Sequence, residues 1–377
     1  MRTRDRLRSG WVSFGEVAMK SSLDIIKPQV RALLAYKLSP HRASVKVNQN
    51  ENPWDAPAPI KKEVQRRLEA RQWSRYPDFV PVSLHVRLAE FSGWRPDGVI
   101  AGNGSNELIQ ALLMAAIGED KRVLISEPTF ALYRQISTVL GSEVISVPLT
   151  NELSYDINAL QKTIGDLQPD VTIVCSPNNP TGCMLSDEHL RALLGITSGL
   201  VVVDEAYHEF SGHSVVPFLR EHENLVVLRT FSKAMAMAAL RVGYLLAAPE
   251  LASEISKAVL PYNLNAISQT AAEVAIEMYE DELRPLVRKI VAERERLYGE
   301  LSRIEGLTPV RSQANFMVVR SSIDPKQVFA ELLKKDILIR DVSGYPMLSD
   351  YFRLSVGTPK ENDLVIESLQ EIFGASR

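Results

Sequence analysis

Short apolar runs alternate with amphipathic stretches through the middle of the chain. Runs of four or five residues, the usual length of a buried strand, occur at Val123–Ser126, Val144–Val147, Val171–Cys175, Leu200–Val203, Leu225–Leu228 and Tyr244–Ala247. Stretches with helical spacing lie between them. This alternation predicts an α/β fold with a mainly parallel sheet and helices on both of its faces.

Helical spacing also precedes and follows this region. The stretches with apolar positions three or four apart are Leu23–Leu38, Ile60–Arg71, Leu84–Phe91, Leu108–Ile117, Ser268–Tyr279 and Leu283–Ile304. Beyond Pro261 the long helical patterns give way to short strands at Phe316–Arg320 and Phe352–Val356. We therefore predict a large domain over residues 48–261 and a smaller α+β domain over residues 262–377, and we expect residues 20–47 to form an N-terminal arm and part of the small domain.

The composition agrees with a large enzyme and disfavours other classes of protein. The chain has 377 residues, of which 45% are hydrophobic and 24% charged, so it can bury a large core. Its formal net charge is -3 and no basic stripe stands out. Neither a nucleic-acid footprint nor an anionic membrane surface is favoured, and we expect partners to be small molecules.

The N-terminus and the cysteines bear on location. Residues 1–19 lack a sustained apolar core, so we expect a disordered extension rather than a signal peptide, and Met19 is an alternative start. No run is long enough to span a bilayer. The two cysteines, Cys175 and Cys183, do not suggest a disulfide framework, and the protein is expected to be cytoplasmic.

Lys233 follows the end of a predicted strand, where α/β enzymes place their chemistry. Most lysines are surface charges, but this one is flanked by Thr230 and Ser232 and followed by Arg241. Hydroxyls and an arginine can hold a phosphate and leave the lysine amine free to form an imine.

Two further strand ends supply what an imine enzyme needs. Asp204 closes the strand Leu200–Val203, and a partly buried carboxylate keeps the ring nitrogen of pyridoxal phosphate protonated. Tyr207 can donate to the ring phenolate. The turn Ser176–Gly182, which contains Asn179, follows the strand Val171–Cys175 and could be no more than a tight loop.

The sequence gives weaker signals for two other kinds of site, a dinucleotide-binding site and a metal site. Gly102 and Gly104 open a helix as in a dinucleotide-binding fold, and Glu127 lies near the distance expected of a ribose-binding acid. Glu107 replaces the third glycine, where close packing needs a small residue. His208 and His213 lack the spacing of a metal motif and a third ligand, so no metal is expected.

In combination these motifs resemble the fold-type-I pyridoxal-phosphate aminotransferases, and among them the histidinol-phosphate aminotransferase family. The likeness spans nearly the whole chain. Besides the stretches around Asn179, Asp204 and Lys233, the matching motifs are Asn50–Pro53, Arg75–Asp78, Gly102–Glu107, Glu127–Phe130, Pro261–Asn263, Ala314–Phe316, Arg340–Asp341 and Tyr351–Gly357.

The resemblance implies roles for individual residues. Lys233 forms the aldimine with pyridoxal 5'-phosphate, Asp204 faces the pyridine nitrogen, and Asn179 and Tyr207 hold the ring oxygen. The residues implied at the cofactor phosphate are Ser105, Asn106, Thr230, Ser232 and Arg241, with Phe130 stacked on the ring. Those implied at the substrate are Tyr36, Asn179, Arg340 and Arg353.

The resemblance also implies a reaction and an assembly. The reaction is a ping-pong transamination in which histidinol phosphate and 2-oxoglutarate give imidazole acetol phosphate and glutamate, a step of histidine biosynthesis. The same fold serves aromatic-amino-acid aminotransferases and threonine-phosphate decarboxylases, and these alternatives stay open. A non-catalytic regulator is disfavoured because the residues before Asn50 are too few for a DNA-binding domain. Tyr76 matches a residue that reaches a neighbouring subunit's cofactor phosphate, so a homodimer with shared sites is expected.

Overall fold

The structure is a computed structural model, and it describes residues 22–35 and 40–374. The chain forms two compact units, Met1–Lys37 and Leu38–Arg377. In the first unit the described part holds a short 3-10 helix, η1 (Ser22–Ile25), and α1 (Pro28–Ala32). Within residues 22–35 the predicted helical stretch is therefore interrupted between these two helices. Pro28 starts a new helix and forces an extended conformation on Lys27, whose ψ is 132°.

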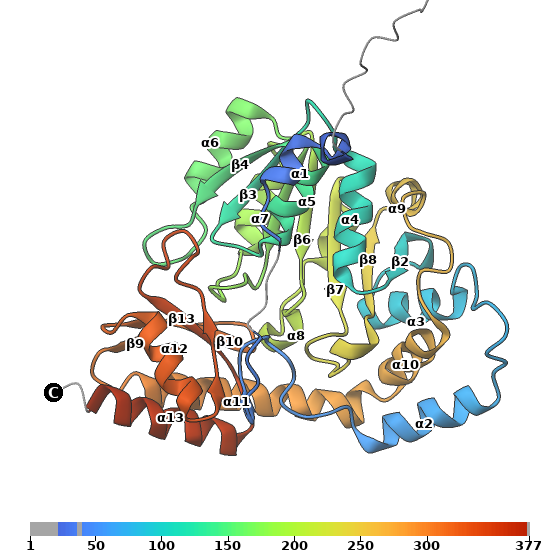
Figure 1. Cartoon of the computed structure of the whole chain (residues 1–377). Helices are drawn as coiled ribbons and strands as arrows, with labels where there is room; N and C mark the ends of the chain where they lie inside the picture. Colours follow the sequence, from blue (N-terminus) through green and yellow to red (C-terminus); the bar gives the residue numbers. More distant parts are fainter. Residues whose placement is uncertain (1–21, 36–39, 375–377) are drawn as a thin grey trace, which may run out of the picture. The chain divides into compact units, whose positions relative to one another are not determined.

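A seven-stranded sheet organises the second unit (Figure 1). Its order is β2-β8-β7-β6-β5-β3-β4, and β8 alone runs opposite to the other strands. The strands are β2 (Val99–Gly102), β3 (Arg122–Glu127), β4 (Glu143–Pro148), β5 (Val171–Cys175), β6 (Leu200–Asp204), β7 (Leu225–Thr230) and β8 (Gly243–Ala247). The predicted strands are confirmed, and β2 is added at one edge.

Successive side chains of each strand enter opposite cores, as the two-residue period of a strand requires. In β6, Val201 and Val203 join the core that also contains Ile60, Leu88 and Leu190, whereas Val202 joins the core with Leu108 and Leu112. The helices on the first face include α2 (Ala58–Glu69), α3 (Val82–Ser92), α6 (Ile157–Leu167), α7 (Asp187–Leu194) and α10 (Ala266–Glu277). Those on the second are α4 (Ser105–Ala116), α5 (Leu132–Leu140) and α9 (Pro249–Ser256).

A smaller antiparallel sheet follows in the chain and has a core of its own. Its order is β12-β13-β10-β9, from β9 (Leu307–Pro309), β10 (Phe316–Ser321), β12 (Arg340–Asp341) and β13 (Tyr351–Ser355). The separate pair β1 (Val45–Lys46) and β11 (Ile337–Leu338) is parallel. The surrounding helices are α11 (Arg284–Leu301), α12 (Pro325–Lys334) and α13 (Pro359–Gly374).

Short helical turns complete the second unit. They are η2 (Pro96–Gly98), α8 (His208–Ser211), η3 (Val216–Arg220), η4 (Ala238–Leu240) and the π-helical turn η5 (Tyr279–Leu283). The last of these joins α10 to α11, so the two helical patterns predicted beyond Pro261 are separated by a π-turn. Such turns are frequent at functional sites.

Candidate active site

The polar motifs of the sequence meet at one edge of the seven-stranded sheet. The parallel strands β5, β6 and β7 end there, which places Asn179, Asp204 and Lys233 at or just beyond their carboxyl ends. Because β8 is antiparallel, its amino end lies at the same edge, and Arg241 precedes that end by two residues. Side chains that follow the parallel strands and a side chain that precedes the antiparallel strand therefore lie at the same edge of the sheet.

The Lys233 side chain lies inside this group and is perturbed by it. Its Nζ donates to the carbonyl oxygen of Gln49 at 2.9 Å. Burial, followed by the positive charge of Arg353, lowers the pKa of Lys233 to about 8, while Glu51 opposes the shift. At pH 7 about a tenth of such an amine is neutral, far more than of an ordinary lysine with a pKa near 10.4.

Asp204 is a buried carboxylate with ordered partners. It is 3% exposed, its Oδ2 accepts from the Tyr133 hydroxyl at 2.6 Å, and its Oδ1 accepts from the backbone N–H of Ala206 at 3.0 Å. Burial raises the pKa of Asp204 to about 6 although the Tyr133 hydrogen bond opposes it. A carboxylate held in this way favours a cationic partner.

The Tyr207 hydroxyl is held by two amides. Asn50 Nδ2 donates to it at 3.2 Å and Asn179 Nδ2 at 3.3 Å. Its ring packs edge-on against Phe316, with centroids 5.0 Å apart. Burial raises the pKa of Tyr207, so the group stays a phenol at neutral pH and keeps its proton to donate.

A cradle with the chemistry of an anion site lies where β7, β8 and α4 meet. Arg241 Nη1 donates to Ser232 Oγ at 3.1 Å, and Thr230 Oγ1 donates to the same oxygen at 3.0 Å. The residue before α4 is Gly104, whose lack of a side chain leaves the first N–H groups of that helix without a side-chain cap. Basic and hydroxyl groups beside a helix N-terminus suit a phosphate.

The two residues predicted at the start of α4 differ in exposure. Ser105 is 9% exposed and begins the helix next to Gly243, where an added Cβ would come within 2.3 Å of the Ser105 nitrogen. Asn106 is exposed at the second position. The strand and helix around them do not form a dinucleotide-binding unit, because β2 pairs antiparallel with β8 and not with a parallel β3.

Two arginines lie opposite each other on the small sheet. Arg340 of β12 and Arg353 of β13 are Cα partners in an antiparallel ladder, which places their side chains on one face. Arg353 is 8% exposed and donates from Nη1 to Asn179 Oδ1 at 2.5 Å and from Nη2 to the Asn48 carbonyl at 2.8 Å. Arg353 therefore joins the Lys233 group, and Arg340 lies opposite Arg353 on the ladder.

The aromatic residues of the prediction have different surroundings. Phe130 is half-buried and packs edge-on against Tyr133, with centroids 5.6 Å apart. Tyr76 is 80% exposed and stacks on Tyr262 at 4.6 Å. Tyr36 lies outside the described residues.

Sequence reasoning missed three residues that fix this site. Tyr133, the donor to Asp204, is three positions beyond Phe130 on α5, so helical periodicity gave a signal for its burial but none for its partner. Asn50 belongs to a recognised motif without an assigned role. Asn178 is fully buried and accepts from Thr129 Oγ1 at 2.8 Å, which ties two of the strand-end loops together.

The family follows from comparison with known proteins. The model of the family "Aminotransferase class I and II" matches residues 43–369. This chain belongs to that family, and the predicted α/β fold and enzyme class are confirmed. Enzymes of the family depend on pyridoxal phosphate, which confirms the predicted cofactor and small-molecule substrates.

Within the family, the similar relatives include histidinol-phosphate aminotransferases. The Chlorobium phaeobacteroides protein of that name is 38% identical over 92% of this chain and 96% of its own length. Histidinol-phosphate aminotransferase 1 of Carboxydothermus hydrogenoformans is 39% identical over 94% of this chain and 98% of its own. These matches confirm the resemblance to the histidinol-phosphate aminotransferases.

A solved structure extends the likeness to the fold. Histidinol-phosphate aminotransferase from Sinorhizobium meliloti, in complex with pyridoxal-5'-phosphate, superposes with a TM-score of 0.84 at 22% identity. The match covers 93% of this chain and 98% of that one.

Residues 22–35 and 40–374 contain neither a membrane-spanning helix nor a metal-binding cluster. No helix there is long and apolar enough to cross a membrane. No cluster of three or more His, Cys, Asp or Glu side chains in that part of the chain could hold a metal ion. His208 bonds to the Glu205 carbonyl at 3.0 Å, and His213 pairs with Asp187 at 2.7 Å.

Proposed function

We propose that this aminotransferase exchanges the amino group of histidinol phosphate with 2-oxoglutarate, giving imidazole acetol phosphate and glutamate in histidine biosynthesis. The names of its relatives support this substrate. The structural observation that carries it is the arginine pair at positions 340 and 353. Like charges directly opposite on a ladder destabilise a sheet, so two arginines there favour an anionic ligand between them.

The two arginines differ in what they offer. Arg353 is held by Asn179 and Asn48 within the Lys233 group, and its planar fork accepts a carboxylate or a phosphate with similar geometry. It serves both amino donor and oxo acid in this proposal. Arg340 lies one strand further out and assists with the phosphate of histidinol phosphate. Tyr36 is proposed as a further substrate contact on the family resemblance alone.

The strand-end groups fit pyridoxal phosphate. The anion cradle of Thr230, Ser232 and Arg241, with the start of α4 at Ser105 and Asn106, would hold its phosphate. Asp204 would face the ring nitrogen, because a buried carboxylate needs a cation. Tyr207 and Asn179 would hold the ring oxygen, and Phe130 would cover the ring.

When bound, the cofactor supplies an electron sink that stabilises negative charge on the substrate's α-carbon. Asp204 would hold a proton on the ring nitrogen. Lys233 is the proposed proton carrier at the α-carbon, since its lowered pKa of about 8 lies near the operating range of a general base. The Gln49 carbonyl orients its amine, and Tyr207 keeps a donor beside the reacting centre.

A donor panel tests the reaction. Purified protein with pyridoxal phosphate and 2-oxoglutarate should form glutamate fastest from histidinol phosphate, when compared with phenylalanine, tyrosine and threonine phosphate. Preference for phenylalanine or tyrosine would assign the protein to aromatic amino acids instead. Release of carbon dioxide from threonine phosphate without glutamate formation would make it a decarboxylase.

Chemical labelling tests the lysine. Borohydride reduction of the loaded protein should fix the cofactor on the peptide that contains Lys233, as mass spectrometry would show. Lys233→Ala should keep cofactor binding and lose turnover. Lys289→Ala is the matched control, because Lys289 is exposed and lies over the Trp54 ring, so both label and turnover should persist. Label on another lysine would refute the assignment.

We further propose a homodimer with shared sites, in the cytoplasm. An exposed apolar surface supports the dimer: Trp73, Tyr76, Phe79, Val82, Leu260 and Tyr262 are 80%, 80%, 62%, 64%, 73% and 41% exposed. Monomers rarely expose aromatic patches of this kind. The two cysteines are free thiols, which suits a reducing compartment.

Subunit mixing tests whether Tyr76 acts on the partner's site. Lys233→Ala and an inactive Tyr76 variant should each show no activity when assembled without the other. If Tyr76 acts across a twofold dimer, both defects of a mixed dimer fall in one site, and about a quarter of all sites recover on random pairing. No recovery after verified subunit exchange, or a monomeric active enzyme, would contradict the shared site.

A further inference from the structure

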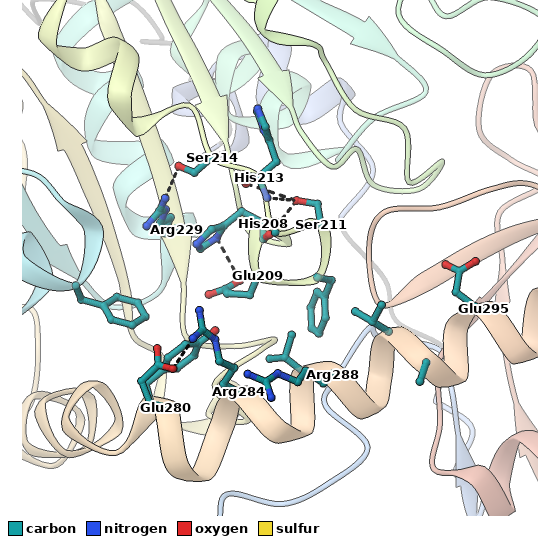
Figure 2. Close-up of a pocket in the computed structure, with 17 residues that line it drawn as sticks. His208, Glu209, Ser211, His213, Ser214, Arg229, Glu280, Arg284, Arg288 and Glu295 are labelled. Carbon is teal, nitrogen blue, oxygen red and sulfur yellow. Dashed lines mark hydrogen bonds and ion pairs between the residues drawn. The ribbon is translucent and has the colours of Figure 1, made fainter.

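A cavity lies beside the carboxyl ends of β6 and β7, separate from the residues assigned to cofactor and substrate. It is open to solvent, has a volume of about 680 Å³ and is lined by α8 and the loop after it, by Arg229 of β7, by the π-turn η5 and by the first turns of α11 (Figure 2). Phe91 and Phe210 give it apolar walls. None of the residues assigned to cofactor or substrate lines it.

Among the described polar groups that line the cavity, the carboxyl group of Glu209 is the one with an unsatisfied oxygen. Its side chain is 5% exposed, and within the described residues its Oε2 accepts no hydrogen bond. Nδ1 of His208 lies 3.2 Å from that oxygen, but the same nitrogen is already bonded to the Glu205 carbonyl. Burial raises the pKa of Glu209 to about 8. A buried acceptor without a partner is costly, and a ligand donor would remove that cost.

The opposite wall carries positive charge. Arg284 and Arg288 lie one turn apart on α11 and line the same cavity as Glu209 (Figure 2). Arg284 is paired with Glu280 at 2.5 Å, whereas the exposed Arg288 has no ion pair in residues 40–374. Deeper in the cavity, Arg229 is neutralised by Glu205 at 2.9 Å. Of these three arginines, Arg288 is therefore the one whose guanidinium is not paired with a carboxylate of the described chain.

We propose that this cavity is a second ligand site and that it binds a free α-amino acid with a ring side chain. The ammonium group would donate to Glu209, the carboxylate would meet Arg288, and the ring would pack against Phe91 and Phe210. A zwitterion satisfies both polar groups at once, whereas a simple anion or cation satisfies only one. Binding at pH 7 would release the Glu209 proton to solvent.

The cavity is connected to the active-site edge through the backbone. His208 and Glu209 directly follow Tyr207, and Arg229 directly precedes Thr230. The Arg229–Glu205 pair links β7 to the end of β6, next to Asp204. An occupant that orders this wall therefore acts on the strand ends that position Lys233 and Asp204. We assign the site a regulatory role, read as a change in kcat rather than as competition with substrate.

Calorimetry on the cofactor-loaded Lys233→Ala variant tests binding without turnover. L-Histidine and L-phenylalanine are the probes. Histamine, which lacks the carboxylate, and imidazolepropionate, which lacks the ammonium, should each bind at least about tenfold more weakly than L-histidine. Glu209→Gln and Arg288→Gln, made in the Lys233→Ala background, should weaken the zwitterions by a similar factor. Arg303→Gln is the control, since it removes an exposed arginine of the segment after α11 that pairs with Glu300.

The outcomes separate this site from the active site. Saturable binding that is weakened by Glu209→Gln and Arg288→Gln, but not by Arg303→Gln, supports the proposal. Absence of saturable binding overturns it, and so does binding that both cavity variants leave unchanged, because the amino acid then occupies the substrate site. In enzyme with Lys233 intact, the two cavity variants should keep basal turnover and lose the effect of added amino acid on kcat. The binding test does not depend on which amino donor the enzyme uses, because Lys233→Ala has no turnover, and the kcat test uses an amino acid that the donor panel shows is not a substrate.

Discussion

Gly104 offers a sharp test of the anion cradle, because its backbone and its neighbour both exclude a side chain. Its φ is 83° and its ψ is 160°, a region that is essentially restricted to glycine. An added Cβ would come within 2.3 Å of Arg241 Nη2 and 3.0 Å of its Cζ. Gly104→Ala must therefore displace the Arg241 guanidinium from Ser232, or shift the backbone that starts α4.

Two costs follow from that geometry. The backbone conformation costs about 1–3 kcal/mol for a residue with a side chain. Loss of one hydrogen bond to a charged phosphate costs about 1.5–3 kcal/mol. The second cost falls on cofactor binding, so the dissociation constant of pyridoxal phosphate should rise by roughly 10- to 150-fold.

The measurement is a spectroscopic titration of cofactor-free protein with pyridoxal phosphate, together with melting of both forms. Gly93→Ala is the matched control, because Gly93 also has a positive φ, of 70°, but an added Cβ meets nothing within 4 Å. Both variants should melt earlier without cofactor, and only Gly104→Ala should lose affinity. Wild-type affinity in a folded Gly104→Ala protein would refute the location of the phosphate.

Three further outcomes are expected from the charges of the two sites. Asp204→Asn should lower kcat by about 100-fold or more while cofactor affinity changes little, because an amide cannot hold a proton on the ring nitrogen; near-normal kcat would remove Asp204 from its role. Arg353→Lys should impair both half-reactions, whereas Arg340→Lys should impair mainly the phosphate-bearing substrate, and single-turnover kinetics with each substrate would show equal losses if this is wrong. For Glu209, whose pKa is raised from 4.5 to about 8 by burial, the native state holds the proton longer than the unfolded state. Its free energy of unfolding should therefore fall by roughly 3–5 kcal/mol as the pH rises from about 4.5 to 8, and urea unfolding of Glu209→Gln should lack that fall.

The strands of the large sheet could be predicted because their burial on both faces is written into continuous apolar runs. Val171–Cys175 has the predicted bounds, and Leu200–Asp204 differs by one residue. The direction of a strand could not be predicted from its apolar run. Tyr244–Ala247 has the same apolar pattern as its parallel neighbours, yet β8 is antiparallel, since direction depends on the connection and not on the strand's own residues.

The same distinction holds for the site: residues beside a strand end could be predicted, and their partners from distant parts of the chain could not. Asp204 and Lys233 could be located from sequence because each stands beside a strand end that its own apolar run marks. The partners that set their chemistry are far away in the chain: Gln49 is 184 residues from Lys233, and Tyr133 is 71 residues from Asp204. Local patterns carry no signal for such pairs. The proposed domain boundary near Pro261 stays a prediction.

Because β8 is antiparallel to β7, one short connection carries both Lys233 and Arg241, the residues proposed for the reactive amine and for the anion cradle. Thr230 and Gly243 are ladder partners, and the N–H of Phe231 bonds to the Val242 carbonyl at 2.9 Å, so the ends of the loop between β7 and β8 are locked together. Within that loop Lys233 and Arg241 emerge on the same edge of the sheet. Had β8 been parallel, a crossover connection would have carried its amino end to the opposite edge, and Arg241 with it. A hairpin ladder thus fixes the ends of the segment that carries both Lys233 and Arg241, and within that segment Ala234, Met235 and Met237 are buried in the core.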